Sequence, residues 1–276
     1  MKRININTYF LYLASVLISV FALFPILWCL STSFKPNHLI FIQPPQWIPK
    51  EITLEHYKQV LGDQRMLQYY LNSFIIASLS TIVALIVGML GAYGFSRYKF
   101  PGSKTILLSF MLTRLLPRVS LIVPFFITLR LLKIYNTRPG LVLVYLVITM
   151  PLTIWLLKGF FDSIPYEIEE AAVIDGCSPL GVLWKIDIPM ILPALAAVGM
   201  YVFITAWNEF LLALTLTKGI QMRNISVGLA FYIDESGIQW GALMAASMLM
   251  SFPPIVVFSV FRKSLVKGLT EGAVKG

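Results

Sequence analysis

The sequence predicts an all-α integral membrane protein with six transmembrane helices and a helix–turn–helix loop on the cytoplasmic side. Of its 276 residues, 58% are hydrophobic and only 13% are charged, whereas a soluble domain carries about 25% charged residues. Six apolar stretches reach the roughly 20 residues that a membrane-spanning helix needs. One charged segment with an internal glycine, Ile164–Pro193, lies between two of these stretches. No second domain is expected within residues 1–276.

The first predicted span follows Lys2 and Arg3, as the apolar core of a signal peptide would. Its uncharged run exceeds the roughly 7–15 residues of such a core, so we expect a retained transmembrane helix. The third span is the least regular, because Arg114 and Arg118 lie inside it. The six spans are approximately Tyr9–Ser31, Tyr69–Phe95, Thr105–Leu132, Leu141–Phe161, Met190–Thr217 and Trp240–Phe261.

Small residues recur along one stripe of the second predicted span. Ala84, Gly88 and Ala92 follow one another at four-residue spacing. In a membrane, small residues on one face let two helices approach closely, and we expect such packing here. The alternative is that glycine is simply frequent in membrane helices.

Six spans place both termini on the same side of the membrane. The numbers of lysines and arginines on the two sides barely differ, but compact basic clusters at Arg97–Lys104 and Arg262–Lys267 adjoin span ends. Such clusters favour the cytoplasmic side. We therefore predict a multi-pass protein of the cell (inner or cytoplasmic) membrane with cytoplasmic termini, and a cytoplasmic loop at residues 162–189 and tail at residues 262–276. Basic residues beside spans also account for the net charge of +9, so no nucleic-acid partner is expected.

Charged side chains occur inside two predicted spans. Arg114 and Arg118 are one helical turn apart and are expected to share a face, and Glu209 lies toward the outer end of the fifth span. Charges at such depth usually face a cavity or a partner. One interpretation is an internal Arg–Glu pair that joins the two spans, and the other is a polar translocation pathway in which an aromatic ring stacks on a sugar-like solute. The pathway residues would be Arg114, Arg118, Tyr201, Trp207, Asn208 and Glu209.

Catalysis within this chain is not expected. The GxxxxGK[ST] pattern of a phosphate-binding loop does not occur. Glu169 and Glu170 are adjacent in a predicted helix, so their side chains diverge and do not form an acid–base pair. His38 and His56 lack the spacing of metal ligands and are expected to be solvated loop residues. No cofactor or metal is therefore expected on this chain, and active transport would draw on an ion gradient or another subunit.

The Ile164–Pro193 segment contains start and stop signals for two short helices. Ser163 is expected to cap the first helix, and Gly176 to end it in the left-handed conformation. Ser178 and Pro179 then begin a second helix, which Pro189 is expected to end. An amphipathic hairpin lying on lipid is one interpretation, and a docking element for a soluble partner is the other. The three carboxylates of the first helix favour docking, because anionic headgroups would repel them.

The spacing within this segment resembles the EAA loop of ABC-importer permeases. Glu170-Ala171-Ala172 is followed after three residues by Gly176 and, nine residues later, by Ile186-Asp187-Ile188-Pro189, with Ile188 where leucine is usual. Nearly the whole chain is similar to carbohydrate-uptake permeases of the maltose/trehalose type, most of all to the smaller membrane subunit. The further similar segments are Tyr98-Lys99-Phe100-Pro101-Gly102, Trp207-Asn208-Glu209-Phe210 and Gly268–Gly276.

The resemblance implies the fold of a type I ABC-importer permease, in which the loop is a coupling helix held in a cleft of an ATP-binding subunit. Glu170 would pair with a basic group there, Ala171 and Ala172 would permit close approach, and Gly176 would form the turn. The implied docking residues are Glu169, Glu170, Ala171, Ala172, Asp175, Gly176, Pro179 and Leu180. The implied tail contacts at the ATPase interface are Gly268, Leu269, Thr270, Gly272 and Lys275.

The implied partners are a homologous second permease subunit, a dimer of ATP-binding subunits that holds ATP and Mg, an extracytoplasmic sugar-binding protein and membrane lipid. The implied function is import of a di- or oligosaccharide by alternating access. One alternative is a permease for another small solute such as glycerol-phosphate. A second is an ion-coupled secondary carrier with Arg114, Arg118 and Glu209 as its coupling site, and a third is a membrane anchor for a soluble complex.

Overall fold

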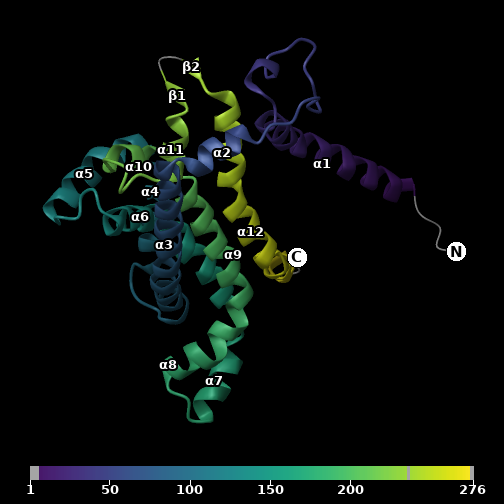
Figure 1. Cartoon of the computed structure of the whole chain (residues 1–276). Helices are drawn as coiled ribbons and strands as arrows, with labels where there is room; N and C mark the ends of the chain where they lie inside the picture. Colours follow the sequence, from purple (N-terminus) through teal and green to yellow (C-terminus); the bar gives the residue numbers. More distant parts are fainter. Residues whose placement is uncertain (1–5, 235–236, 274–276) are drawn as a thin grey trace. The chain divides into compact units, whose positions relative to one another are not determined.

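The computed structural model describes residues 6–234 and 237–273, whose regular elements are helices apart from one short antiparallel hairpin (Figure 1). The longer helices are α1 (Ile6–Ser33), α3 (Gln64–Arg97), α4 (Ser103–Thr113), α5 (Ile122–Leu131), α6 (Arg138–Asp162), α9 (Ile188–Trp207) and α12 (Trp240–Ala273). The shorter elements are η1 (Asn37–Leu39), α2 (Glu55–Gly62), η2 (Arg118–Leu121), α7 (Tyr166–Ile174), α8 (Pro179–Val182), the π turn η3 (Leu183–Asp187), α10 (Leu211–Leu216), α11 (Ile225–Ala230), β1 (Ile233–Asp234) and β2 (Gly237–Ile238).

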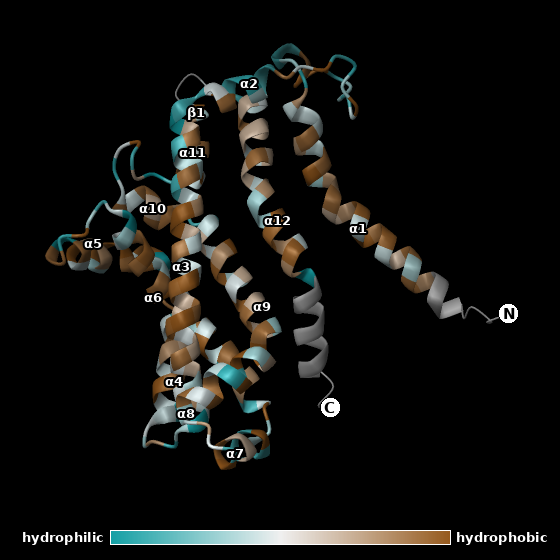
Figure 2. Cartoon of the chain, turned by 60° about the horizontal axis from the view of Figure 1, so that its bottom comes forward, coloured by the Kyte–Doolittle hydropathy of each residue, from teal (hydrophilic) through white to brown (hydrophobic). Residues whose placement is uncertain are grey.

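Among the described residues, five helical segments are long and apolar enough to cross a membrane, in agreement with the predicted fold class. Figure 2 shows hydrophobic residues along α1, α3 and α9 and hydrophilic residues around α2 and β1. The spans are Phe10–Ser33, Gln64–Arg97, Arg138–Asp162, Pro179–Trp207 and Trp240–Arg262. A sixth is obtained only if α4 and η2–α5 are taken together as one broken span.

The third predicted span is not one straight helix. Its halves, Ser103–Thr113 and Arg118–Leu131, are bent by 103°. The break falls at Pro117, which has an extended backbone (φ −59°, ψ 129°) and no N–H to continue a helix. Arg114 ends α4 and Arg118 begins η2, so the prediction that these two arginines share one helix face was wrong.

The fifth predicted span begins and ends earlier than expected. The helix that starts at Pro179 continues through η3 into α9 and stops at Trp207, so Pro189 does not end it. Pro189 lies in the first turn of α9, directly after the π turn. Its missing N–H therefore falls where the regular i→i−4 ladder is already interrupted.

The chain forms two compact units, and the smaller one contains residues 1–67 and 228–252. His56 is buried there, with Nε2 2.9 Å from the Lys35 carbonyl oxygen. Its imidazole lies against Gly241 so closely that no side chain would fit at that position. The expectation of a solvated His56 was wrong, because α2 packs on the start of α12 through this ring.

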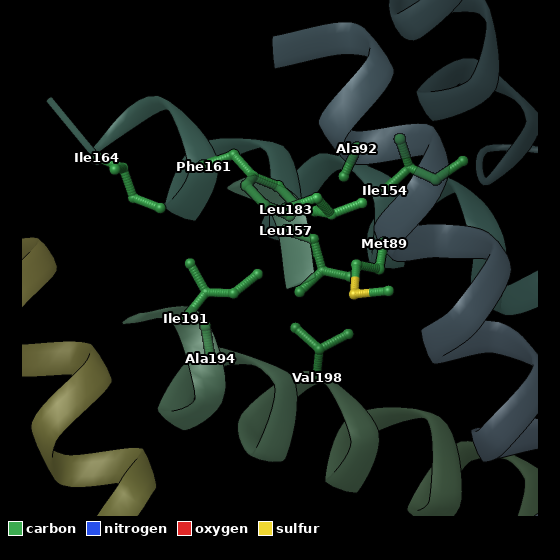
Figure 3. Close-up of a cluster of buried hydrophobic side chains, with 10 residues drawn as sticks. All are labelled: Met89, Ala92, Ile154, Leu157, Phe161, Ile164, Leu183, Ile191, Ala194 and Val198. Atoms are coloured by element: carbon green, nitrogen blue, oxygen red, sulfur yellow. The ribbon is translucent and has the colours of Figure 1, made fainter. Parts of the chain in front are cut away.

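The larger unit contains residues 68–227 and 253–276 and is centred on the packing of α3, α6 and α9. Figure 3 shows an apolar cluster within it. Ile164 and Leu183 also belong to this cluster, so both ends of the helix–turn–helix loop are anchored in the membrane bundle. The remaining members are Met89, Ala92, Ile154, Leu157, Phe161, Ile191, Ala194 and Val198.

The stripe of small residues on α3 faces α6, as the spacing predicted. Ala84 and Ala92 are fully buried. A Cβ atom added at Gly88 would lie 2.5 Å from Cγ2 of Thr153 on α6. The two backbones therefore approach more closely than a side chain at this position would allow.

Replacing Gly88 with leucine should destabilise the bundle by about 1–3 kcal/mol, because the added atoms overpack the contact with Thr153. Thermal unfolding of the detergent-solubilised protein measures this loss. Gly94→Leu is the matched control on the same helix, since no atom lies within 4 Å of a Cβ there. Equal unfolding midpoints for the two variants would contradict the close α3–α6 packing.

Candidate functional site

The helix–turn–helix loop consists of α7 and α8 joined at Gly176. Gly176 has a φ of +87°, a left-handed conformation that glycine adopts without strain. The N–H of Cys177 donates to the Ala172 carbonyl at 2.9 Å and closes the end of α7. Ser178 caps α8, since its Oγ accepts from the Gly181 N–H at 3.2 Å. The predicted turn and second helix start are thus confirmed.

The first helix start differs from the prediction. Ser163 ends α6 and donates its hydroxyl proton to the Phe160 carbonyl at 2.7 Å, so it does not cap α7. Pro165 precedes the first residue of α7 with an extended backbone (φ −59°, ψ 134°) and no side-chain cap. Proline sets the entry geometry of this helix by its fixed φ alone.

The adjacent carboxylates Glu169 and Glu170 point in different directions. Glu169 is buried and forms an ion pair with Arg97, the last residue of α3. Arg97 Nε donates to Glu169 Oε1 at 2.6 Å, and the two side chains are only 5% and 11% exposed. Glu170 is exposed. One carboxylate therefore holds the loop, while the other is presented at its surface.

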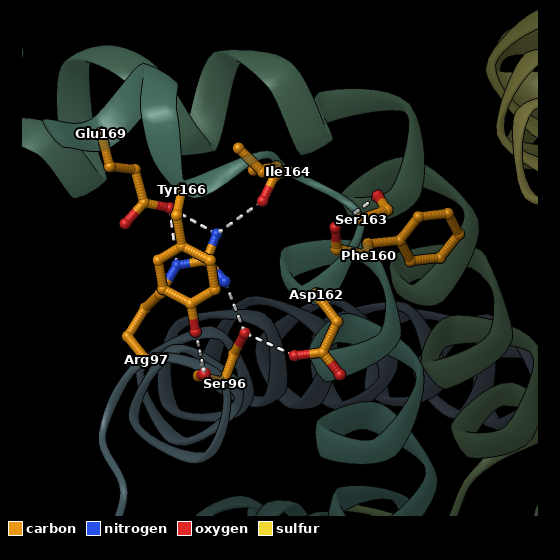
Figure 4. A network of polar contacts seen from close by, with 8 residues as sticks. All are labelled: Ser96, Arg97, Phe160, Asp162, Ser163, Ile164, Tyr166 and Glu169. Carbon is orange, nitrogen blue, oxygen red and sulfur yellow. Dashed lines mark hydrogen bonds and ion pairs between the residues drawn. The ribbon is translucent and has the colours of Figure 1, made fainter. Parts of the chain in front are cut away.

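Arg97 also connects α7 to α6 (Figure 4). Its Nη1 donates to Ser96 Oγ at 2.8 Å, and that hydroxyl donates to Asp162 Oδ1 at 2.6 Å. The Tyr166 ring lies 4.7 Å from the guanidinium and adds a cation–π contact. The Tyr166 hydroxyl donates to the Ser96 carbonyl at 3.1 Å. The ends of α3 and α6 and the start of α7 are thus fixed at one point.

The far end of the loop exposes a patch of large apolar side chains beside charged groups. Ile174 is 85% exposed and Leu180 is 66% exposed, and Val173 and Trp184 are more than half exposed. Glu170 is among the exposed charges. Apolar side chains gathered on an exposed, partly charged loop are typical of a surface that binds another protein.

The predicted docking residues divide between this surface and the loop interior. Glu169 and Ala172 are buried. The exposed ones are Glu170, Ala171, Asp175, Gly176, Pro179 and Leu180. The surroundings of Gly268, Leu269, Thr270 and Gly272, and Lys275 as a whole, lie outside the described part of the chain.

Two of the predicted pathway residues, Trp207 and Glu209, are buried and form contacts within the chain. Trp207 is fully buried, with its ring stacked on Phe203 at 5.8 Å and edge-on to Tyr70 at 5.4 Å. The Glu209 carboxylate is buried and accepts the Leu212 and Ala213 N–H groups, each at 3.0 Å. Glu209 therefore satisfies the first N–H groups of the short helix α10, which follows the end of α9 at Trp207.

The other predicted pathway residues remain accessible. Arg114 Nη2 donates to the Tyr201 hydroxyl at 3.4 Å, and Arg114, Arg118 and Asn208 are exposed. Within the part of the chain that the structure describes, Glu209 forms no ion pair with Arg114 or Arg118. The internal Arg–Glu pair considered from the sequence is therefore absent from these residues.

Comparison with known proteins agrees with this arrangement. Residues 84–271 match the family described as the inner membrane component of binding-protein-dependent transport systems. The chain belongs to this family. It is 34% identical over 265 residues to the sulfoquinovosyl glycerol transport system permease SmoH of Agrobacterium fabrum, covering 96% of this chain and 93% of the relative. It is 35% identical over 269 residues to the trehalose/maltose transport system permease MalG of Thermococcus litoralis, covering 96% of each.

Among solved structures, a bacterial ABC transporter involved in import of the acidic polysaccharide alginate has a chain that matches with a TM-score of 0.78 and 25% identity. The match covers 93% of this chain and 96% of that one. The present chain is thus a multi-pass membrane permease with the fold of an ABC importer, as its sequence predicted.

Sequence reasoning did not single out Arg97 or Tyr166 as part of the loop's attachment. Arg97 entered only as a member of a basic cluster beside a span end. Its closeness to Glu169 depends on the return of α6 to the end of α3, across 72 positions of the chain. An arginine as the last residue of an apolar span, in a chain with a later loop rich in carboxylates, is the signal that could have suggested this pair.

Glu169→Gln should destabilise the attachment of the loop by about 3–5 kcal/mol, because it leaves the buried Arg97 guanidinium without its counter-charge. Faster proteolysis and amide exchange within residues 164–187 would show this. Lys158→Met is the control, since it breaks a more exposed ion pair with Asp162 and should change stability by less than about 1 kcal/mol. Equal protection in both variants would show that the buried pair does not hold the loop.

Proposed function

We propose that this chain is the membrane permease subunit of an ATP-driven sugar importer, with the α7–α8 loop as the docking element for a separate ATP-binding subunit. The observation that carries the proposal is the division of the loop into a firmly anchored base and an exposed apolar tip. Lipid contact alone would not require a buried ion pair at the base. The printed functions of the relatives, transport of sulfoquinovosyl glycerol and of trehalose and maltose, support a carbohydrate as the solute.

The exposed tip fits a cleft on a partner protein. Ile174 and Leu180 supply the apolar contact, and Glu170 supplies a charge for a basic group at the rim. ATP and Mg would be held by that partner. A ligand shifts a conformational equilibrium only if it binds the two states with unequal affinity. ATP would therefore act by changing the contacts that the partner makes with this tip. The membrane helices would then alternate between inward- and outward-open forms, with the loop and both termini in the cytoplasm.

The proposed assembly also includes a homologous second permease, a second ATP-binding subunit and an extracytoplasmic sugar-binding protein. The family description, dependence on a binding protein, supports the last of these. The most apolar window of the first span has no buried residues within the chain, so α1 offers an apolar surface to lipid or to a partner helix.

For the translocation pathway, we propose the accessible polar group formed by Arg114, Arg118, Tyr201 and Asn208. Trp207 and Glu209 would support the pathway residues without contacting the solute, because both are buried in other contacts. The hydrogen bonds that Glu209 accepts weigh against an ion-coupled carrier in which this carboxylate binds the coupling ion. The backbone N–H groups of α10 already satisfy this carboxylate.

Gly176→Val should release the ATP-binding subunit from the detergent-solubilised complex. A Cβ at this position meets no atom within 4 Å, so the effect would come only from the left-handed backbone, which a β-branched residue strongly disfavours. Co-purification through a tag on this chain measures the release.

Gly176→Asn is the matched variant, because asparagine tolerates the left-handed conformation better than other non-glycine residues. It should retain most of the bound subunit. If Gly176→Val retains the partner and normal ATP hydrolysis, the docking assignment is wrong.

Deleting residues 268–276 should alter the rate of ATP hydrolysis by the complex while leaving membrane insertion and co-purification intact. The reason is that the resemblance implies a contact between this tail and the interface of the ATPase dimer, separate from the docking loop. ATPase assays on the purified complex measure the effect, and an unchanged rate would refute the tail contact.

A further inference from the structure

Arg114 and Arg118 stand on either side of the break between α4 and η2, and neither has a carboxylate partner in the described part of the chain. Both are exposed, and neither takes part in an ion pair among these residues. They are four positions apart, so their Cα atoms are separated by at most about 14 Å. Two neighbouring positive charges inside a membrane-spanning segment are costly unless an anion approaches them.

The helices that surround the break do not supply this anion. Gln64–Phe161, which covers α3, α4, α5 and all of α6 except its last residue, contains no aspartate or glutamate. Ile188–Ile233, which covers α9, α10 and α11, contains only Glu209. The Glu209 carboxylate is buried and accepts the N–H groups of Leu212 and Ala213. The compensating charge therefore comes from outside these helices.

Lipid headgroups are a poor source of that charge for Arg114. With the basic cluster Arg97–Lys104 at the membrane surface, Arg114 lies 11 positions beyond the start of α4 at Ser103, or about 17 Å along the helix. This is about half of the roughly 30 Å hydrocarbon core, whereas arginines reach headgroups from near helix ends. Arg114 Nη2 instead donates to the hydroxyl of Tyr201 on α9 at 3.4 Å, so its guanidinium is directed to the neighbouring helix.

The groups at the break have the chemistry to bind an anionic sugar. A guanidinium presents a planar fork of donors that matches a carboxylate or a phosphate. The Tyr201 hydroxyl, already bonded to Arg114, and the exposed amide of Asn208 both donate and accept, as binding of sugar hydroxyls requires. A neutral sugar would accept hydrogen bonds from the guanidinium groups but leave both positive charges uncompensated.

We propose that the translocated solute is a carbohydrate with an anionic group, a carboxylate or a phosphate, and that Arg114 and Arg118 bind this group. Tyr201 and Asn208 bind its hydroxyls. This inference rests on the proposed function, and it assigns a substrate class to the accessible polar group that forms the proposed pathway.

A cysteine reporter tests whether the break attracts anions. Leu115, which is 78% exposed and lies between the two arginines, is changed by Leu115→Cys in an assembled complex that also carries Cys29→Ser and Cys177→Ser. Its rates with the anionic thiol reagent MTSES and the cationic reagent MTSET are each divided by the rate with free β-mercaptoethanol. We expect a preference for MTSES of about tenfold, because charges of one sign concentrate counter-ions in a cleft. Arg114→Gln with Arg118→Gln should abolish this preference, whereas Arg114→Lys with Arg118→Lys should retain it.

Protection of the same cysteine identifies the anionic group. D-Glucuronate, glucose 6-phosphate and D-glucose are added at matched ionic strength, and Leu115→Cys is labelled with the uncharged reagent methyl methanethiosulfonate. An anionic sugar should protect at about tenfold lower concentration than glucose, because hydrogen bonds to charged groups are the stronger ones. Stronger protection by glucuronate indicates a carboxylate, and stronger protection by glucose 6-phosphate indicates a phosphate. Equal protection by glucose, or protection by none of the three, would overturn the substrate class.

The remaining outcomes separate this inference from the proposed function. If Arg114→Gln with Arg118→Gln releases the second permease subunit, the arginines pair with that subunit and the inference is wrong. Equal rates with the two charged reagents, or no reaction with either, also refute it, and the docking function stands if the ATP-binding subunit still co-purifies. If no ATP-binding subunit co-purifies with the unmodified chain, the proposed function itself is wrong, whatever the reagent preference.

Discussion

The buried ion pair between Arg97 and Glu169 is the constraint on which the helix–turn–helix part of the structure depends. A loop that only rested on the ends of helices could move without moving them. Here the guanidinium at the end of α3 is held by a carboxylate from α7, by the Ser96 hydroxyl and by an aromatic ring. Such a buried pair is weak evidence of net stability, because desolvation offsets much of its attraction. Its value lies in geometry, since it fixes where the loop can be while its tip remains exposed.

The ion pair also gives two adjacent carboxylates different roles. One attaches the loop, and the other presents a charge at its surface. Glu169 and Glu170 are neighbours and look equivalent in the sequence, yet one is buried and the other exposed. Helical geometry requires their divergence, because successive side chains point about 100° apart. Which of the two faces inward is decided by Arg97, on another helix. Local reasoning therefore predicts two different faces but cannot assign them.

The fold was predictable wherever one local signal dominated. Long apolar runs identified most of the spans, Gly176 marked the turn, and the spacing of Ala84, Gly88 and Ala92 identified the α3 face that packs on α6. Predictions were wrong where several signals competed. Pro117 broke a span that hydropathy joined, whereas Pro189 did not end a helix because a π turn precedes it. Ser163 does not cap α7, because its hydroxyl bonds to the nearby Phe160 carbonyl. The burial of His56 depended on contacts between distant segments, which no local pattern contains.

The break between α4 and α5 has a consequence for where this part of the chain can lie. At the 103° bend the N–H groups of Arg114, Leu115 and Leu116 form short-range turn hydrogen bonds, but the regular helical ladder ends before Pro117. Two arginines stand at the same place. Irregular backbone at membrane depth is tolerated only where protein or water satisfies its polar groups, so residues 113–118 are expected to face protein or a water-filled space and not lipid.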